Sequence, residues 1–431
     1  MLDLKRIRTE TDAVKAAIKK REMDLDAVVD EILSLDEKRR ALQSEVGGMK
    51  AEQNAVTKKI PQIKKEGGDV AAVMAEMKTL SAAIKEKDTA LSEAEAALRE
   101  QMLRLPNLPD PDVVAGGKEQ NVPLSYDGEQ PRFDFPAKNH VELCESLGMI
   151  DYERGAKIAG NGSWIYRGMG ARLEWALLNF FITEHLKDGY ELILPPHMLN
   201  YTCGYVAGQF PKFADEVYWI KNPTSSDEKF LLPTAETALV NLHRDEILTA
   251  AELPRKYIAY TPCYRREAGS YRSEERGMIR GHQFNKVEMV QYTTADGSDA
   301  AFEELVGKAQ RLVHELGLHY RLSKLAAGDC SFSMARTYDI EVWIPSMGIY
   351  KEVSSASNAR DYQARRGNIR FRREATGKTE FVHTLNGSGL ATSRIFPAMV
   401  EQNQRADGSV VVPEVLRKYL GGLEVLEKKN F

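Results

Sequence analysis

Apolar residues near the N-terminus recur at spacings of three and four, the spacing of residues that share one face of a helix. The first run covers residues 28–60 and the second covers residues 70–105. Pro61, Gly67 and Gly68 separate the runs, so we expect the turn between them there. Because neither apolar face is buried alone, the pattern predicts an antiparallel pair of helices. An arm of about 33 residues per helix would be roughly 50 Å long at about 1.5 Å per residue.

The first of these helices is rich in basic residues. Between residues 38 and 65 there are eight Lys or Arg residues and two acidic residues. The pattern alone leaves two interpretations open. One is a solvent-exposed coiled coil with interhelical ion pairs, and the other is a basic stripe that binds phosphate groups.

Prolines at positions 106, 109 and 111 end the second helix, and the sequence changes character beyond residue 123. Helical segments there mix with β-rich segments that follow one another without an intervening helix, which favours an antiparallel sheet over a Rossmann arrangement. We therefore expect an N-terminal helical domain at 1–105, a linker at 106–122 and an α+β domain at 123–431. A chain of 431 residues is long enough for two domains.

Composition excludes several classes of protein. The sequence has no apolar run long enough to cross a membrane, and it starts with charges where a signal peptide needs apolar residues, so we expect a cytoplasmic protein. Its four cysteines are scattered without a CxxC pair, which indicates a reducing compartment and argues against a zinc site. The net charge of −4 does not favour a polyanionic partner. The two commonest nucleotide-binding loops, GxGxxG and GxxxxGK[ST], do not occur.

Charged residues occupy predicted strands where one face of a sheet should be packed. The segments TPCYRRE and HQFNKVE carry Arg265 with Glu267, and Phe284 with Lys286 and Glu288. Residues two apart on a strand share a face, so each group lies on one side of its strand. Unpaired charges on a packed face would each cost several kcal/mol, so this face is expected to line a binding site.

Three further segments carry polar groups of the same kind. They are LLPTAETAL with Thr234 and Glu236, YKEVSSASN with Glu352, Ser354 and Ser355, and TLNGSGLATSR with Asn386, Ser388 and Arg394 around an expected double-glycine turn. Arginine side chains suit phosphate oxygens, and carboxylates with hydroxyls suit Mg²⁺ or an ammonium group. Any one segment alone is typical of a surface ion pair. Together they predict a site for ATP and a small amine-bearing molecule.

These segments resemble the class II aminoacyl-tRNA synthetases. RRE at 265–267 with the loop to Arg280 and HQFNKVE resembles motif 2, and GSGLATSR followed by FPAMVEQNQ resembles motif 3. TAET, EVSSASN, the opening MLDLKRIRTETDAV and the helical arm resemble the seryl-tRNA synthetases in particular. The resemblance implies a class II antiparallel β-sheet flanked by helices, with an N-terminal antiparallel two-helix coiled-coil arm. It also implies a homodimer.

The resemblance implies a reaction as well. L-serine would attack ATP to give seryl-adenylate, and serine would then pass to the 3′ end of tRNA(Ser) and also of tRNA(Sec). Arg265 and Arg394 are the implied catalytic residues, with Arg265 on the α-phosphate. The implied ATP-binding residues are Arg265, Arg266, Glu267, Arg280, Phe284, Glu352, Val353, Ser354, Ser355 and Arg394. The implied serine-binding residues are Thr234, Ala235, Glu236, Glu288, Asn386 and Ser388.

Further roles follow from the same resemblance. Phe284 would stack on adenine, and Glu352 and Ser355 would hold Mg²⁺, with no zinc. The arm would grip the long variable arm of the tRNA, which favours the basic-stripe interpretation. The candidate contacts there are Lys38, Arg39, Arg40, Lys50, Lys58 and Lys59.

Two other functions compete with this interpretation. A ligase that loads an amino acid onto a carrier protein would lack the helical arm, and this sequence has one. A non-catalytic binding module of synthetase descent would lose phosphate-binding or Mg²⁺-binding residues, whereas Arg265, Glu352 and Arg394 are all present. A purely structural coiled-coil protein would account for residues 1–105 alone.

Overall fold

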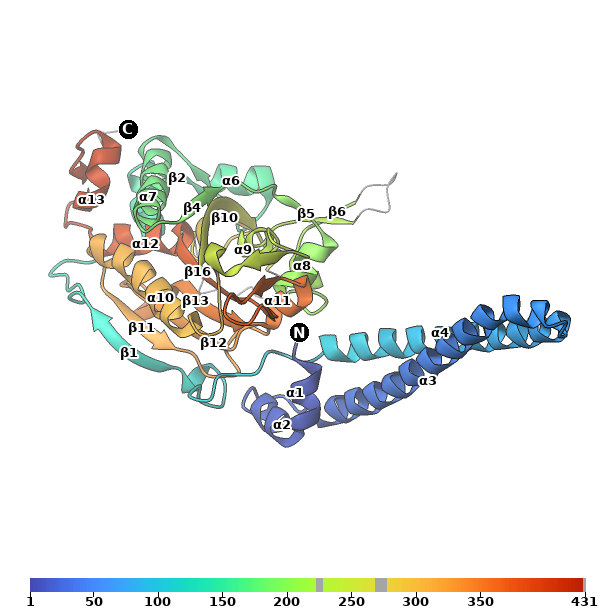
Figure 1. Ribbon diagram of the computed structural model, residues 1–431. Coiled ribbons are helices and arrows are strands. Elements are labelled where there is room, and N and C mark those ends of the chain that lie inside the picture. The colour runs from blue at the N-terminus through green and yellow to red at the C-terminus, as the bar shows by residue number, and fades with distance from the viewer. Residues whose placement is uncertain (222–227, 268–276, 429–431) are drawn as a thin grey trace. The chain divides into compact units, whose positions relative to one another are not determined.

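The computed structural model describes residues 1–221, 228–267 and 277–428 (Figure 1). The chain divides into two compact units, which we call the arm unit and the sheet unit. The arm unit comprises Leu2–Lys19 and Met23–Pro106, and the sheet unit comprises Met1, Lys20–Glu22 and Asn107–Phe431. The expected functional domains at 1–105 and 123–431, with a linker at 106–122, stay a prediction.

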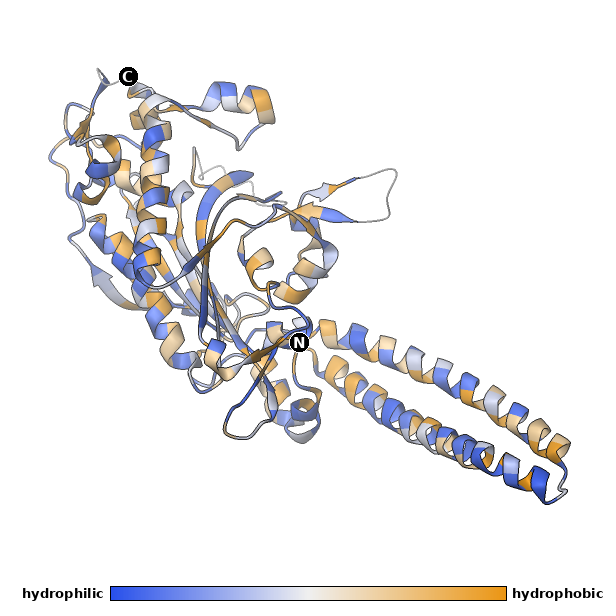
Figure 2. Cartoon of the chain, turned by 45° about the horizontal axis from the view of Figure 1, so that its top comes forward, coloured by the Kyte–Doolittle hydropathy of each residue, from blue (hydrophilic) through white to orange (hydrophobic). Residues whose placement is uncertain are grey.

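The arm unit contains the expected pair of long helices. Its helices are α1 (Leu4–Thr9), α2 (Thr11–Lys19), α3 (Asp26–Lys65) and α4 (Val70–Leu103). Figure 2 shows hydrophobic residues recurring in short bands along both long helices. Most of the buried apolar residues of the pair come from the predicted repeats, namely Val28, Ile32, Val46, Ile84, Leu98 and Met102. The predicted two-helix arm is therefore confirmed.

The turn of this hairpin forms at the glycines of the expected turn segment and excludes its proline. Pro61 was expected to mark the turn, but it lies inside α3, which continues to Lys65. A proline removes one backbone hydrogen bond of a helix, and so close to the helix end few turns depend on that bond. The turn forms at Gly67, as expected, where φ is +75°, and α4 is capped at its N-terminus by Asp69, whose side chain accepts hydrogen bonds from the backbone N–H groups of Ala71 and Ala72.

The centre of the sheet unit is a sheet of eight strands (Figure 1). In spatial order they are β1 (Val122–Asp127), β11 (Tyr320–Lys324), β12 (Arg336–Ile344), β13 (Ile349–Arg360), β16 (His383–Ala391), β10 (Gln283–Thr293), β9 (Arg255–Tyr264) and β4 (Glu191–Ile193). All neighbours are antiparallel except β4 and β9, which pair in parallel. The predicted antiparallel sheet is confirmed. The expected double-glycine turn in TLNGSGLATSR is wrong, because this segment runs extended through β16 and pairs with β10.

Helices cover both faces of this sheet, and the alternation of β10 explains why. Val287 and Met289 point into one apolar cluster, and Val290 and Tyr292 point into another on the opposite face. The first cluster is completed by α7 (Gly168–Lys187), α10 (Ser298–Glu315) and α12 (Thr392–Gln402). The second is completed by α8 (Tyr201–Ala207), α9 (Glu236–Leu239) and α11 (Tyr362–Gly367). We call these the α7 face and the α9 face.

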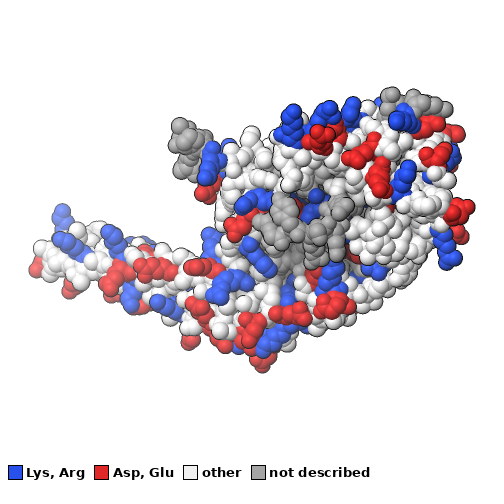
Figure 3. Space-filling view, turned by 180° about the vertical axis from the view of Figure 1, so that it is seen from behind, with Lys and Arg blue, Asp and Glu red and all other residues white. Residues whose placement is uncertain are grey.

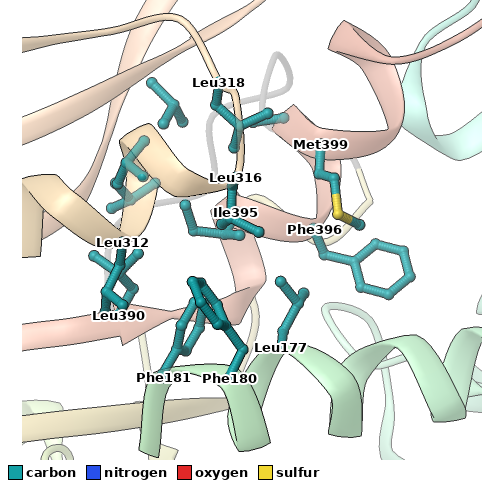
Figure 4. Close-up of a cluster of buried hydrophobic side chains, with 14 of the residues drawn as sticks. Leu177, Phe180, Phe181, Leu312, Leu316, Leu318, Leu390, Ile395, Phe396 and Met399 are labelled. Carbon is teal, nitrogen blue, oxygen red and sulfur yellow. The ribbon is translucent and has the colours of Figure 1, made fainter. Parts of the chain in front are cut away.

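Figure 4 shows the inner part of the α7 face. Leu177, Phe180 and Phe181 of α7 point toward Leu390 of β16 and toward Ile395 and Phe396 of α12. Each of these six side chains is at most 1% exposed. A core packed this closely holds α7 and α12 in a fixed position behind the sheet.

Shorter elements surround the sheet. The remaining helices are α5 (His140–Ser146), α6 (Tyr152–Ala159) and α13 (Glu414–Arg417). The remaining strands are β2 (Ile150–Asp151), β3 (Ile165–Tyr166), β5 (Met198–Asn200), β6 (Trp219–Ile220), β7 (Lys229–Leu231), β8 (Ile247–Thr249), β14 (Arg370–Arg372), β15 (Thr379–Phe381), β17 (Val410–Val411) and β18 (Val425–Leu426). Among the described residues, no helix is long and apolar enough to cross a membrane.

Candidate active site

A cavity of about 520 Å³ opens on the α9 face of the sheet. It brings together polar residues from all five predicted segments. Those that line it are Thr234, Glu236, Arg265, Glu267, Arg280, Glu288, Glu352, Ser355, Asn386, Ser388 and Arg394. A smaller cleft adjoins it, and Phe284 and Val353 line that cleft together with Arg265 and Arg394. We call this second space the aromatic cleft.

Three predicted residues are placed differently. Ala235 is fully buried in the apolar cluster of the α9 face, and Ser354 is fully buried with its hydroxyl donating to the backbone oxygen of Ser388 at 2.6 Å. Arg266 donates to the backbone oxygen of Asp215 at 3.0 Å. None of the three lines either space, so any contact they make with a ligand requires their backbone atoms or a movement. The charged loop at 268–276 lies outside the described residues.

The arginine and carboxylate at the end of β9 take fixed positions. The guanidinium of Arg265 lies over the ring of Phe284 at 5.1 Å, and its Nε donates to the backbone oxygen of Pro233 at 3.3 Å. Glu267 has a φ of +50°, which is uncommon for a residue with a side chain. Its carboxylate accepts a hydrogen bond of 2.6 Å from Arg280. Arg265 and Glu267 line the same cavity, as expected, although both residues lie just after the end of β9.

A second group of charges lines the larger cavity. Lys286 and Glu288, two apart on β10, share a face as expected and form a close ion pair. The ammonium of Lys286 also donates to Thr234 Oγ1 at 2.8 Å. Both Lys286 and Glu288 are at least nine-tenths buried. Such a pair is stable in the interior because each charge has its partner there.

Glu236 is the other buried carboxyl of this group. Its Oε1 accepts hydrogen bonds from Gln363 Nε2 at 2.8 Å and from Asn386 Nδ2 at 3.1 Å. Burial, and then the charge of Glu288, raise the pKa of Glu236 to about 7. At neutral pH the cavity therefore holds in Glu236 a buried carboxyl group that readily takes a proton.

A third group joins β13 to the first turn of α12. Arg394 Nη1 donates to the backbone oxygen of Glu352 at 2.8 Å and contacts its carboxylate at 3.2 Å. Ser355 donates to Asp339 Oδ1 on β12 at 2.7 Å. Burial, followed by the charge of Glu352, raises the pKa of Asp339. Glu352 and Ser355 thus share a region with Arg394.

The oxygen ligands of this region fit a magnesium ion that arrives with a nucleotide. Glu352 and Ser355 offer one carboxylate and one hydroxyl, which are the hard ligands Mg²⁺ prefers. In the described ranges, no cluster of three or more His, Cys, Asp or Glu could hold a metal by itself. The protein donors are therefore too few for a closed cage and suit an ion that keeps phosphate oxygens and water among its ligands.

Two family models and several known proteins match this chain. The model described as the seryl-tRNA synthetase N-terminal domain matches residues 1–109, and the model described as the tRNA synthetase class II core domain (G, H, P, S and T) matches residues 218–403. Serine--tRNA ligase 2 of Clostridium acetobutylicum is 61% identical over 423 residues, which cover 98% of this chain and 99% of that protein. The chain belongs to the seryl-tRNA synthetase family.

A solved structure and a further relative agree with this membership. The seryl-tRNA synthetase of Pyrococcus horikoshii, complexed with ATP, has a TM-score of 0.91 at 33% identity, and the match covers 99% of both chains. The serine--tRNA ligase of Alkaliphilus oremlandii is 47% identical over 433 residues, covering 99% of this chain and all of that protein. The predicted family of ATP-dependent aminoacyl-tRNA synthetases and the class II fold are both confirmed.

The seryl-tRNA synthetase arm carries the six basic residues that were predicted to bind tRNA. Arg39 and Arg40 both bind the buried carboxylate of Asp36, at 2.7 and 3.0 Å. Lys50 of α3 pairs with Asp88 of α4 at 2.8 Å. Lys38, Lys58 and Lys59 have no ion-pair partner within the described part of the chain. Figure 3 shows Lys and Arg mixed with Asp and Glu along the arm, so the interhelical ion pairs of the first interpretation do occur.

Several residues of this seryl-tRNA synthetase cavity received no role from sequence. The sequence already placed Lys286 on the same strand face as Phe284 and Glu288. A lysine between two predicted substrate-binding residues is typical of a counter-ion, so it received no role of its own. Gln363 and Asp339 act through other side chains and lie far from the motifs in sequence. Ser331, Phe332, Ser333 and Met334 line one side of the cavity from an irregular segment that carries no periodic signal.

Proposed function

We propose that this protein is a serine--tRNA ligase that activates L-serine with ATP and transfers serine to the 3′ end of tRNA(Ser). The observation that supports this most strongly is one cavity lined both by buried carboxyl groups beside Lys286 and by arginines. The carboxyl groups suit the ammonium and hydroxyl groups of serine, and the arginines suit a triphosphate. The Pyrococcus horikoshii relative, whose structure holds ATP, shares the fold over 99% of this chain.

Serine binds, in this proposal, among Thr234, Glu236, Glu288, Asn386 and Ser388, with the backbone of Ala235 behind them. Glu288, which pairs with Lys286, orients the ammonium group. Glu236 accepts or donates a hydrogen bond toward the hydroxyl. A site built to bond a hydroxyl rejects alanine, because alanine would leave buried polar groups without partners.

ATP binds beside the arginines of the larger cavity and in the aromatic cleft. Phe284 stacks on the adenine ring, Glu267 approaches its exocyclic amine, and Arg394 covers the other face and reaches the γ-phosphate. Arg265 holds the α-phosphate, where charge develops as the serine carboxylate attacks, and Arg280 binds the outer phosphates. Backbone atoms of Arg266, Val353 and Ser354 complete the walls. Glu352 and Ser355 would hold Mg²⁺, which neutralises charge on the triphosphate when bound.

Most of the rate can come from orientation and electrostatics without a covalent enzyme intermediate. Positioning the serine carboxylate in line with the α-phosphate makes the attack effectively unimolecular. Arg265 and Arg394 are the catalytic residues in this scheme because they touch the reacting phosphates. The first attack forms seryl-adenylate and releases pyrophosphate. The terminal ribose hydroxyl of the tRNA then attacks the carbonyl carbon of seryl-adenylate, and AMP leaves.

The arm binds the long variable arm of tRNA(Ser), and by the same contacts tRNA(Sec). Lys38, Lys58 and Lys59 are the strongest candidates because their charges are not taken by an internal carboxylate. Arg39, Arg40 and Lys50 would have to bind phosphate while keeping or exchanging their ion pairs. The 1–105 domain thus serves tRNA, the 106–122 linker connects, and the 123–431 domain carries the chemistry, in the cytoplasm.

The protein acts as a homodimer in this proposal. β4 is an edge strand of the central sheet, and Leu192 and Leu194 beside it are 37% and 76% exposed. Trp175 on α7 is 54% exposed. Apolar side chains beside a free strand edge suit a second copy of the same surface.

The first test is serine-dependent exchange of labelled pyrophosphate into ATP, with each of the twenty amino acids in turn. Exchange with serine alone, followed by serine-dependent charging of tRNA(Ser), is the expected result. Charging of tRNA(Sec) transcripts tests the wider tRNA specificity. Exchange with no amino acid would refute the proposal.

A further inference from the structure

A buried carboxyl on α7 lies directly behind the aromatic cleft. Glu174 is 3% exposed, and none of the predicted motifs contains it. Its Oε1 accepts a hydrogen bond from Asn285 Nδ2 at 2.7 Å and another from Thr392 Oγ1 at 2.6 Å. A single oxygen therefore joins three elements, the helix α7, the strand β10 and the first turn of α12.

The two donors adjoin the residues that form the cleft. Asn285 stands on β10 between Phe284, which lines the aromatic cleft, and Lys286, which lines both spaces. Because successive side chains of a strand point to opposite faces, Asn285 points to the α7 face while its neighbours point to the cavity. Thr392 begins α12, two residues before Arg394.

The bond between the two donors reinforces this arrangement. Thr392 Oγ1 also lies 3.2 Å from the backbone oxygen of Asn285. The strand that carries Phe284 and the helix that carries Arg394 are thus tied to one another and to Glu174. Their separation sets the width of the aromatic cleft, because Phe284 and Arg394 line it from these two elements.

The helix that carries Glu174 is a firm support. Leu177, Phe180 and Phe181 of α7 pack on Leu390 and on residues of α12, as Figure 4 shows. About three helical turns beyond Glu174, on the same face of α7, His185 Nε2 lies 2.9 Å from the backbone oxygen of Gly389. A Cβ at position 389 would lie 2.2 Å from that nitrogen, so only glycine permits this approach. α7 therefore holds the β16–α12 segment at two polar points.

A carboxyl is a costly choice at this position if packing alone matters. Burial raises the pKa of Glu174 to about 7, against the hydrogen bonds from Thr392 and Asn285, which lower it. A leucine would fill similar space without that penalty, but it would leave the Asn285 amide and the Thr392 hydroxyl without their acceptor. The polar side chain is explained by the need to hold these two donors at one point.

We propose that Glu174 is a positioning residue that sets the spacing between Phe284 and Arg394 and thereby the affinity for the adenine ring of ATP. This inference rests on the proposed function, in which the aromatic cleft binds adenine. It assigns Glu174 no contact with any substrate. Its effect passes through Asn285 and Thr392, so these two residues should show the same selectivity for ATP over serine.

The test compares the variants Glu174→Leu, Thr392→Val and Glu174→Gln in pyrophosphate exchange, with ATP and serine varied separately. Losing the acceptor should raise KM for ATP roughly tenfold in Glu174→Leu, and losing one donor should raise it about three- to fivefold in Thr392→Val, the scale of a buried hydrogen bond. KM for serine should change less than about twofold in both, since the serine contacts lie elsewhere. Glu174→Gln keeps an acceptor oxygen and should stay within about twofold of wild type. Titration calorimetry with ATP alone should show the same order of Kd values.

Glu184→Leu is the matched control. Glu184 is a second buried carboxyl on α7, and it pairs with Lys187 at 2.6 Å, a partner outside the cavity. It should change thermal stability and leave both KM values unchanged. In the double variant Glu174→Leu with Thr392→Val, the rise in KM for ATP should be smaller than the two single effects combined. Both single variants remove the same hydrogen bond between Glu174 and Thr392, which the double variant can lose only one time.

The outcomes separate the two proposals. Absence of serine-dependent exchange in the wild type would refute the proposed function itself. Normal wild-type exchange with an unchanged KM for ATP in Thr392→Val, or with equal rises for ATP and serine, would refute the role of Glu174. Should Glu174→Leu fail to fold, the two KM values and the calorimetric Kd for ATP of Thr392→Val still decide between these results.

Discussion

Lys286 is a buried cation of the cavity that bonds Glu288 and Thr234. Replacing it with Met should strongly destabilise the protein. The variant removes the ion-pair partner of the buried Glu288, and breaking a buried pair in this way costs about 3–5 kcal/mol. Urea unfolding of the variant and the wild type should show this loss.

Lys256→Met is the control for this change. Lys256 also pairs with a glutamate, Glu304, at 2.7 Å, but the pair is partly exposed, at 20% and 35%. A pair of that kind contributes about 0–1 kcal/mol. Equal destabilisation by the two variants would contradict the buried-charge argument.

The ionisation of Glu174 predicts a dependence of stability on pH. Because its pKa is raised from 4.5 to about 7, the folded protein binds the proton more tightly than the unfolded chain does. This contribution is fully present below pH ~4.5 and is lost as the pH rises through about 7. Glu174→Gln removes this loss. The variant should match wild type near pH 5 and exceed its free energy of unfolding at pH 8.5 by up to ~3 kcal/mol, since one pKa unit is worth about 1.4 kcal/mol.

Denaturant unfolding of both proteins at pH 5, 7 and 8.5 measures this difference. Glu236 has a similarly raised pKa and titrates in the same range, so the two proteins must be compared at each pH. A constant difference across the three pH values would show that Glu174 does not titrate there.

Sequence reasoning at the residue scale succeeded where strand periodicity decides which side chains share a face. It grouped Lys286 with Glu288 on one face of β10 and brought most of the predicted ligands to one cavity. It did not find Glu174, because a single glutamate in an apolar helix reads as an exposed position. The role of Glu174 depends on its hydrogen bonds with Asn285 and Thr392, and both residues are distant from it in sequence.

At the scale of elements, the long helices of the arm unit distribute their charges unevenly. Lys50 has an internal partner on α4, whereas Lys58 and Lys59 have none among the described residues. Changing Lys58 and Lys59 together to Ala should raise KM for tRNA(Ser) about tenfold and lower the slope of affinity against salt by roughly two, as for two lost phosphate contacts. Pyrophosphate exchange without tRNA should stay unchanged.

Lys87→Ala is the control for the arm variants. Lys87 pairs with Glu45 at 3.0 Å, so its charge is already compensated within the hairpin. Its loss should leave the salt slope unchanged. The same slope in the Lys58 and Lys59 double variant as in wild type would refute their role in tRNA binding.

The helical repeats predicted the arm, and the run of strands without helices predicted the sheet, because each pattern follows directly from the geometry of its element. One expected turn, in TLNGSGLATSR, was wrong, and Pro61 was wrongly included in the turn of the arm. Glycine and proline permit a turn but do not require one, so Pro61 stays within α3, and the glycines of TLNGSGLATSR allow close packing in β16. Tertiary contacts, such as His185 against Gly389, determine which of these uses applies.

At the scale of the whole molecule, the exposed apolar residues around β4 predict a dimer. Leu194→Glu should place a charge beside the free strand edge and convert the protein to monomers. Sedimentation velocity at micromolar concentration should show a dimer for wild type and a monomer for the variant. Leu124→Glu is the control, because Leu124 is 47% exposed on β1 at the other edge of the sheet. A monomeric wild type would refute the proposed homodimer.

Three cations of the cavity already have carboxylate partners within the protein, since Arg280 pairs with Glu267, Arg394 with Glu352 and Lys286 with Glu288. Binding an anion at Arg280 or Arg394 is therefore an exchange of one counter-ion for another. A lone phosphate ion can replace only one internal carboxylate. Its binding free energy is small because the new ion pair replaces an existing one. A triphosphate reaches several cations together and gains from each exchange while losing its freedom of motion once. Selection for the intact nucleotide over inorganic phosphate is thus a property of the pairing itself, and it would persist at the millimolar phosphate levels that accompany metabolism.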